Sequence, residues 1–172
     1  MRAYLAVAIA GLLAASSARA LEEWPTYGHD YGDTRYSPLK QITSSNVASL
    51  KPVWTYHMRT QDRASRGFVP SQNTPIVVKG VMYVSTPYGR VVALDAETGK
   101  QRWAYQVPGS DQPATRGVSY WPGSKPEIVF GTRGGLLIAL HAETGEPVKS
   151  FGKDGVVDLH SAAVMQGFPQ AA

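Results

Sequence analysis

Short apolar runs separated by tight turns dominate the chain from residue 76 onward. Each run is too short for a helix and is rich in β-branched or aromatic residues, which is typical of strands. The first four runs cover residues 76–78, 81–85, 91–94 and 102–107. Lys79-Gly80 fits a two-residue hairpin turn between the first two. The pattern therefore predicts an antiparallel unit of four strands.

The same unit recurs farther along the chain. Its strands are expected at residues 118–121, 127–130 and 136–140, with a weaker fourth strand at residues 148–151. The segment from Ala93 to Gly99 nearly repeats from Ala139 to Gly145, and 139 − 93 gives a period of 46 residues. A repeat of roughly 40–50 residues built from short strands is typical of propeller blades. The predicted fold class is all-β, a partial β-propeller of about two to three four-stranded antiparallel blades.

Tryptophans mark strand positions in these units. Trp103 follows the first Thr-Gly turn and is expected to pack across to a neighbouring blade. Trp54 and Trp121 are expected in the core or between blades for the same reason. Lys149 stands where the second unit should carry its tryptophan, so its docking is expected to differ.

The first sixty residues divide into two parts. Residues 1–20 are expected to be a cleavable secretion signal, because Arg2 precedes an apolar run too short to span a bilayer and Ala18-Arg19-Ala20 fits a cleavage site. Residues 21–60 predict an N-terminal segment with a short helix, capped by Ser44 or Ser45, and a closing strand at residues 53–58. Residues 61–172 are expected to hold the first blades, truncated. Export predicts a periplasmic protein, free or associated with the inner membrane.

Composition narrows the classes of function. Without Arg2 and Arg19 of the signal, 15 basic residues face 13 acidic ones, and no Lys/Arg cluster is present, so nucleic acid is not expected as a partner. There is no cysteine, which excludes disulfides, and the four histidines lack the spacing of metal ligands. Propellers close with about four to eight blades. The chain is therefore expected to be the N-terminal part of a longer protein.

Several stretches, taken in order, resemble the quinoprotein dehydrogenases, which are alcohol and glucose dehydrogenases that depend on pyrroloquinoline quinone (PQQ). They begin with Trp24-Pro25-Thr26-Tyr27-Gly28 and include Arg116-Gly117-Val118-Ser119-Tyr120-Trp121. The others are residues 35–42 followed by Asn46-Val47 and Leu50, residues 74–78 with Met82-Tyr83, and residues 151–159. The repeat motif alone is weak, since non-enzymatic propellers share it, whereas the ordered set is specific.

This resemblance implies an eight-bladed propeller with PQQ and Ca²⁺ near its axis. The complete protein would oxidise a sugar, polyol or alcohol and pass electrons to a membrane quinone or a cytochrome. The family's metal ligands and its catalytic aspartate are expected on later blades, beyond residue 172. No catalytic residue and no metal ligand is therefore assigned in this chain.

Two cofactor-binding positions are carried over from the resemblance. Arg116 matches the family's PQQ-contacting arginine, and a guanidinium suits the carboxylates and quinone oxygens of PQQ. Gln72 aligns with a family glutamate; it can still hydrogen-bond a cofactor but brings no charge. An ordinary loop arginine and an ordinary strand-entry residue are the structural alternatives for these two positions.

The sequence leaves two further alternatives open. Ala114-Thr115 precede Arg116 where alcohol dehydrogenases of this type carry adjacent cysteines, which favours the glucose or polyol branch. A cofactor-free propeller scaffold of the outer-membrane assembly type is the competing function. The blade repeat and Gln72 are compatible with it, but the Arg-Gly-Val-Ser-Tyr-Trp stretch argues against it.

Overall fold

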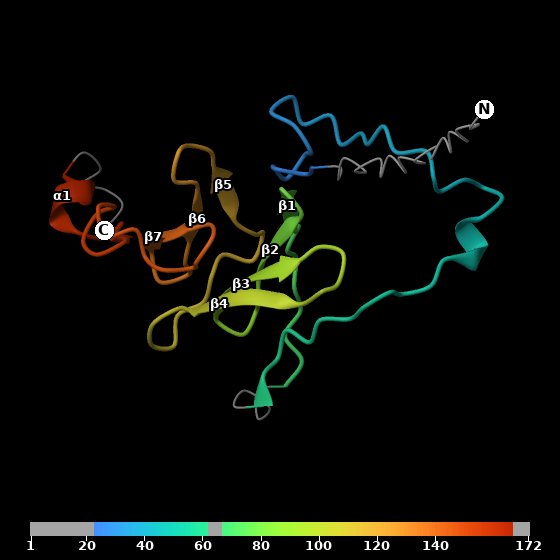
Figure 1. Cartoon of the computed structure of the whole chain (residues 1–172). Coiled ribbons are helices and arrows are strands. Elements are labelled where there is room, and N and C mark those ends of the chain that lie inside the picture. Colours follow the sequence, from blue (N-terminus) through green and yellow to red (C-terminus); the bar gives the residue numbers. More distant parts are fainter. Residues whose placement is uncertain (1–22, 62–66, 167–172) are drawn as a thin grey trace, which may run out of the picture.

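The computed structural model describes residues 23–61 and 67–166. Two four-stranded antiparallel sheets follow one another along the chain (Figure 1). Sheet 1 contains β1 (Ile76–Val78), β2 (Val81–Ser85), β3 (Arg90–Asp95) and β4 (Gln101–Gln106). Sheet 2 contains β5 (Ser119–Trp121), β6 (Glu127–Gly131), β7 (Leu136–His141) and β8 (Val156–Asp158). The strands of each sheet lie in chain order, which is the arrangement of a propeller blade and confirms the all-β prediction.

The structure repeats with the period found in the sequence. β3 begins at Arg90 and β7 at Leu136, a shift of 46 residues (136 − 90). Lys79-Gly80 forms the hairpin turn between β1 and β2, and Val78 pairs with Val81 across it. In this repeated core the strand prediction was right for seven of the eight strands, with ends shifted by a residue or two.

Three local predictions were wrong. Residues 148–151 do not form the fourth strand of sheet 2; they turn, and β8 pairs with β7 instead. Residues 53–58 make no strand ladder, although their side chains alternate between exposed and half-buried as a strand would. The predicted helix shrinks to the 3₁₀ turn η1 (Val47–Ser49), which follows Asn46 rather than a capping Ser44 or Ser45. A short helix, α1 (Ala162–Met165), had no sequence signal.

The predicted signal at residues 1–20 lies outside the described residues, as do residues 62–66 and 167–172. Of the helices in the described part, neither has the length or apolar character to cross a membrane.

The main core lies between the two sheets. Strand register places alternate residues of sheet 1 on the face toward sheet 2, where they form one buried cluster with residues of β6 and β7. The cluster is centred on Ile76, Val91, Trp103, Ile128, Phe130, Ile138 and Leu140. The opposite face of sheet 1 carries Val84, Val92 and Leu94, and residues 54–58 cover it with Trp54, Tyr56 and Met58. Sheet 1 is therefore packed on both faces.

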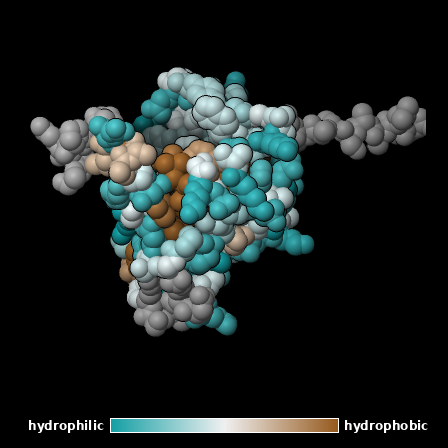
Figure 2. All heavy atoms as spheres, turned by 90° about the vertical axis from the view of Figure 1, so that its left-hand side faces the viewer, coloured by the Kyte–Doolittle hydropathy of each residue, from teal (hydrophilic) through white to brown (hydrophobic). Residues whose placement is uncertain are grey.

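The outer face of sheet 2 is less covered. Register places Val129, Leu137 and Val157 on the face opposite the shared core, and all three are only half-buried. Hydrophobic atoms reach the surface on this side of the molecule (Figure 2). This is the apolar face that a further blade would bury in a propeller.

Trp103 joins the two sheets. Its Nε1 donates a hydrogen bond to the carbonyl oxygen of Ala142 at 2.9 Å, in the Thr-Gly turn of sheet 2. The ring lies directly against Gly145, where an added Cβ would come within 2.6 Å of it, and Gly145 has a φ of +75°. The glycine of the repeated turn is thus required twice, by the backbone conformation and by the tryptophan.

Trp54 makes the same contact one repeat earlier. Its Nε1 donates to the carbonyl oxygen of Ala96 at 3.2 Å, and its ring lies against Gly99. The prediction that Trp54 and Trp103 pack between structural units is therefore confirmed. Lys149 occupies the turn after Val148, so sheet 2 offers no equivalent tryptophan at that position.

Asp95 stabilises the turn between β3 and β4. Its carboxylate accepts hydrogen bonds from the backbone N–H and the hydroxyl of Thr98, at 3.0 and 2.9 Å, and pairs with Arg102 at 2.9 Å. The hydrogen bond from Arg102, followed by those from Thr98, lowers the pKa of Asp95 to about 2. His141 stands at the equivalent place in sheet 2, so this turn is fixed differently in the two blades.

Replacing Asp95 by asparagine is expected to make the free energy of unfolding depend less on pH in the acid range. Folding lowers the pKa of Asp95, so the ionised carboxylate stabilises the folded state. This stabilisation is fully present above the ordinary pKa of 3.8 and is lost as the pH falls toward about 2. Denaturant midpoints measured from pH 6 to pH 2 should therefore converge for Asp95→Asn and the wild type at the acid end. Glu97→Gln, which removes a carboxylate from the same turn, is the control. If the denaturant midpoints of Asp95→Asn and wild type differed by the same amount at every pH, the stabilising role of the ionised Asp95 carboxylate would be refuted.

Candidate functional site

One end of the two sheets gathers the predicted site residues. In an antiparallel sheet the start of the first strand lies beside the end of the second and the start of the third. Gln72 precedes β1 and Arg116 precedes β5, and the backbone N–H of Thr74 donates to the carbonyl oxygen of Arg116 at 3.5 Å. The structure therefore brings the two segments together. We call this side of the sheets the Arg116 end.

Gly117 fixes the approach of the two segments. A Cβ at this position would lie 3.0 Å from the carbonyl oxygen of Thr74 and 3.2 Å from Oδ1 of Asn73, and its φ is +122°. Only glycine allows both the contact and the backbone conformation. The requirement for glycine directly after Arg116 thus has a physical cause in the close approach of the segments that precede β1 and β5.

The Arg116 side chain is exposed and lines a cavity of about 780 Å³. Its guanidinium makes no hydrogen bond or ion pair with any residue in the described part of the chain, whereas its backbone is held against the segment of Asn73 and Thr74. A cation on a fixed backbone is well placed to receive an anionic ligand.

The walls of this cavity are aromatic and come from two parts of the chain. The N-terminal segment supplies Tyr27 and Tyr31, and β5 with its flanks supplies Tyr120 and Trp121. Among the described residues that line it, Arg116 alone is charged. Planar aromatic walls with one guanidinium suit a flat, anionic ligand.

The prediction for Trp121 was wrong. This residue was expected in the core or between blades, but 68% of it is exposed and it forms part of the cavity wall. The reason is its register: Tyr120 points toward the shared core, so the side chains on either side of it point outward.

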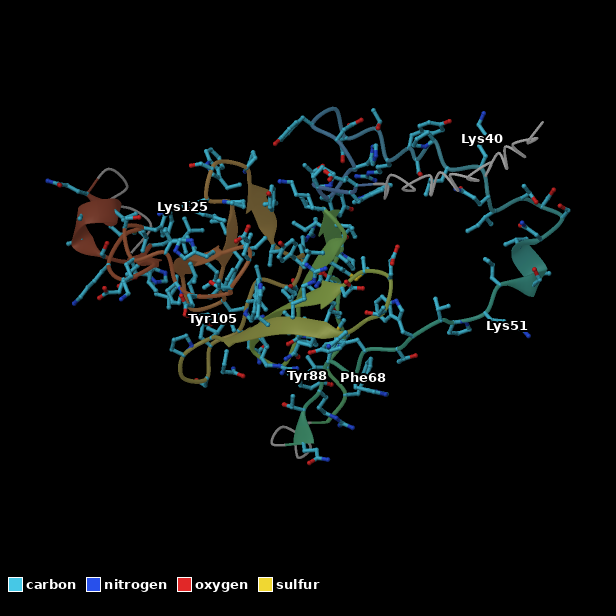
Figure 3. All side chains as sticks on the ribbon, viewed as in Figure 1. Lys40, Lys51, Phe68, Tyr88, Tyr105 and Lys125 are labelled. Carbon is cyan, nitrogen blue, oxygen red and sulfur yellow. The ribbon has the colours of Figure 1, made fainter. Side chains whose placement is uncertain are left out.

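Two lysines of the N-terminal segment lie away from the sheets. Lys40 and Lys51 are on the arm formed by residues 34–53, which extends outward from both sheets (Figure 3). Neither contributes to the cavity.

Gln72 is exposed and does not line this cavity. It lies two residues before Thr74, the residue that touches the backbone of Arg116. Its predicted role as a cofactor contact stays a prediction. What the structure shows is that its segment runs beside that of Arg116.

Sequence reasoning missed the aromatic wall. Tyr27 and Tyr31 stood out only as parts of a turn-rich signature, and their meeting with Trp121 depends on an isolated bridge between Trp24 and Val77. The two backbone hydrogen bonds of that bridge, each 2.8 Å, lay the N-terminal segment along the free edge of β1. No local sequence pattern signals such a pairing across some fifty residues.

No group of three or more His, Cys, Asp or Glu side chains that could hold a metal ion occurs in residues 23–61 and 67–166. The structure therefore assigns no metal ligand within these ranges.

Comparisons with known proteins agree on one family. Residues 24–170 match the family described as "Glucose/ethanol/alcohol dehydrogenase, beta-propeller domain". The dehydrogenase subunit of the quinone-type alcohol dehydrogenase of Gluconobacter oxydans is 43% identical over 136 residues, covering 74% of this chain and 17% of that protein. The quinoprotein glucose dehydrogenase of Escherichia coli is 36% identical over 160 residues, covering 81% of this chain and 20% of that protein.

A solved structure shows the same relationship. The crystal structure of the quinohemoprotein alcohol dehydrogenase from Comamonas testosteroni matches with a TM-score of 0.60 and 37% sequence identity, covering 76% of this chain and 20% of that chain. The chain thus spans only about a fifth of the length of these relatives. The ordered strands, the repeated turns and the comparisons together show that the chain belongs to the family of PQQ-dependent glucose, ethanol and alcohol dehydrogenases and carries part of its β-propeller domain.

Proposed function

We propose that the protein carrying this chain is a periplasmic PQQ-dependent dehydrogenase that oxidises a small alcohol, sugar or polyol, and that Arg116 binds a carboxylate of PQQ. The observation that supports this most directly is the exposed guanidinium of Arg116 on a backbone held by Thr74 and Gly117, at the edge of an aromatic cavity. The relatives act on alcohols or glucose according to their names, and substrate class is inferred from them.

The described residues fit PQQ in charge and shape. PQQ is flat and carries three carboxylates, and a forked guanidinium binds a carboxylate through two parallel hydrogen bonds. Tyr27, Tyr31 and Trp121 offer ring faces or edges for a planar ligand. Arg35 lies 5.0 Å from the centre of the Tyr27 ring, a cation–π contact that limits where this ring can move.

PQQ, when bound, accepts the two electrons that leave the alcohol carbon. This part of the chain would bind and orient the cofactor and would not transfer a proton itself. Tyr83 is consistent with a purely structural role, because burial raises its pKa to about 12 and its hydroxyl donates to the carbonyl oxygen of Ala142. We propose that Ca²⁺, the catalytic base and the docking surface for a quinone or cytochrome acceptor lie on other blades.

The branch within the family remains part of the proposal. The chain contains no cysteine, so the segment before Arg116 carries no disulfide. This feature supports a glucose or polyol substrate, as does the name of the Escherichia coli relative. The names of other relatives support an alcohol. The two classes are separated by assay rather than by the residues of these two blades.

Reconstitution tests the proposed function. The complete apo-protein should show no reduction of an artificial electron acceptor with ethanol, 1-butanol, glucose or glycerol, and should gain activity with at least one of them after PQQ and Ca²⁺ are added together. PQQ omitted and Ca²⁺ omitted are the two controls. Binding of neither PQQ nor any of these substrates would favour the scaffold function instead.

A further inference from the structure

The linker between β4 and β5 is attached to the turn between β6 and β7. The backbone N–H of Ala114 donates to the carbonyl oxygen of Gly131 at 2.8 Å, and the N–H of Arg133 donates to the carbonyl oxygen of Gln112 at 2.9 Å. Pro113 forms an isolated bridge with Thr132 between them. Residues 112–114 and 131–133 thus make a short antiparallel pairing at the Arg116 end of the sheets.

Asp111 closes this pairing with its side chain. Its Oδ1 accepts a hydrogen bond from the backbone N–H of Gly134 at 2.9 Å and from that of Gln112 at 2.7 Å. A Cβ on Gly134 would come within 2.7 Å of the carboxylate, so the carboxylate lies directly on the turn. One side chain therefore joins the two segments at the end of the pairing where Gln112 lies opposite Arg133, across 23 residues of sequence.

The carboxylate is ionised near neutral pH. Burial raises the pKa of Asp111, but hydrogen bonds from Thr132, Gln112 and Gly134 outweigh it and hold the pKa below its usual value. Hydrogen bonds to an ionised acceptor are stronger than neutral ones. The attachment is thus stronger than its few contacts suggest.

This attachment leads directly to Arg116. The carbonyl oxygen of Ala114 accepts a hydrogen bond from Ser85 at 3.3 Å, and the carbonyl oxygen of Arg116 accepts one from Thr74. Only Thr115 separates these two fixed points. The backbone that carries the guanidinium is therefore held on its N-terminal side by the pairing that Asp111 closes.

We propose that Asp111 is a positioning residue that fixes Arg116 for binding the carboxylate of an anionic, planar quinone cofactor. The identity of the ligand rests on the proposed function. The positioning of Arg116 by Asp111 rests only on the hydrogen bonds described above. Asp111 does not touch the cavity and acts only through the backbone of residues 112–116.

A double-mutant cycle tests it in the complete apo-protein titrated with PQQ. Asp111→Ala is expected to weaken PQQ binding about tenfold. Asp111→Asn keeps the Oδ1 acceptor, so its affinity for PQQ should fall much less. In an Arg116→Ala background, Asp111→Ala should have almost no further effect, because the residue it positions is gone. Glu97→Ala, at the opposite end of sheet 1, is the matched control and should bind PQQ as the wild type does.

Hydrogen exchange separates the positioning from the cofactor. In the apo-protein, Asp111→Ala should speed exchange at residues 112–117 while the melting temperature changes little. The proposal would be overturned if Asp111→Ala left the exchange rates of residues 112–117 unchanged. It would also be overturned if Asp111→Ala reduced the affinity for PQQ equally in the wild-type and the Arg116→Ala backgrounds. If the wild type binds no PQQ at all, the proposed function fails, and the exchange data still decide whether Asp111 fixes the Arg116 backbone.

Discussion

Replacing Trp103 by alanine is expected to destabilise the complete protein by about 3–5 kcal/mol, the usual cost of truncating a buried tryptophan. The side chain is 8% exposed, lies in the core between the two sheets and packs against Tyr83 with ring centres 5.9 Å apart. Its loss would leave a cavity between the blades and remove a hydrogen bond to the carbonyl oxygen of Ala142. Equilibrium denaturation followed by circular dichroism measures the change.

Trp121 provides the matched control. It is the same residue type on a neighbouring strand, but 68% of it is exposed, so Trp121→Ala should change the free energy of unfolding by no more than about 0.5 kcal/mol. Similar losses for the two variants would contradict the view that Trp103 joins the blades.

The blade core could be predicted because its signals are local. Alternating apolar residues, the Lys79-Gly80 turn and the repeated Thr-Gly each specify structure within a few residues, and their recurrence at 46 residues adds a second, independent constraint. The position of Trp103 followed from the same repeat, since the glycine it packs against is the glycine of the turn.

The parts that were mispredicted depend on distant partners. β8 has only three residues, and what makes it a strand is its pairing with β7. Residues 53–58 have strand-like alternation, yet Trp54 and Tyr56 pack on the face of sheet 1 instead of joining its edge. Alternation shows that one side of a segment is buried and does not show whether its backbone pairs.

The candidate site follows the same division. Arg116 was identified by resemblance, and the structure adds what the sequence could not show: its fixed backbone and the cavity beside it. Tyr27, Tyr31 and Asp111 came to light only through contacts between segments far apart in the chain.

Arg116→Ala is expected to weaken PQQ binding about 10- to 150-fold, which corresponds to about 1.5–3 kcal/mol for hydrogen bonds to a charged group. Arg116→Lys should fall between this variant and the wild type, because lysine keeps the charge but cannot form the two parallel hydrogen bonds of a guanidinium. The free energy of unfolding should change little with either substitution, since the side chain is exposed and makes no hydrogen bond or ion pair within the described residues. Fluorescence titration of the apo-protein with PQQ at fixed ionic strength measures the affinities, with Gln72→Ala as comparison and a smaller expected loss. If Arg116→Ala bound PQQ as tightly as the wild type, the guanidinium would have to serve another ligand, and the cavity with its aromatic walls would lose its assigned cofactor.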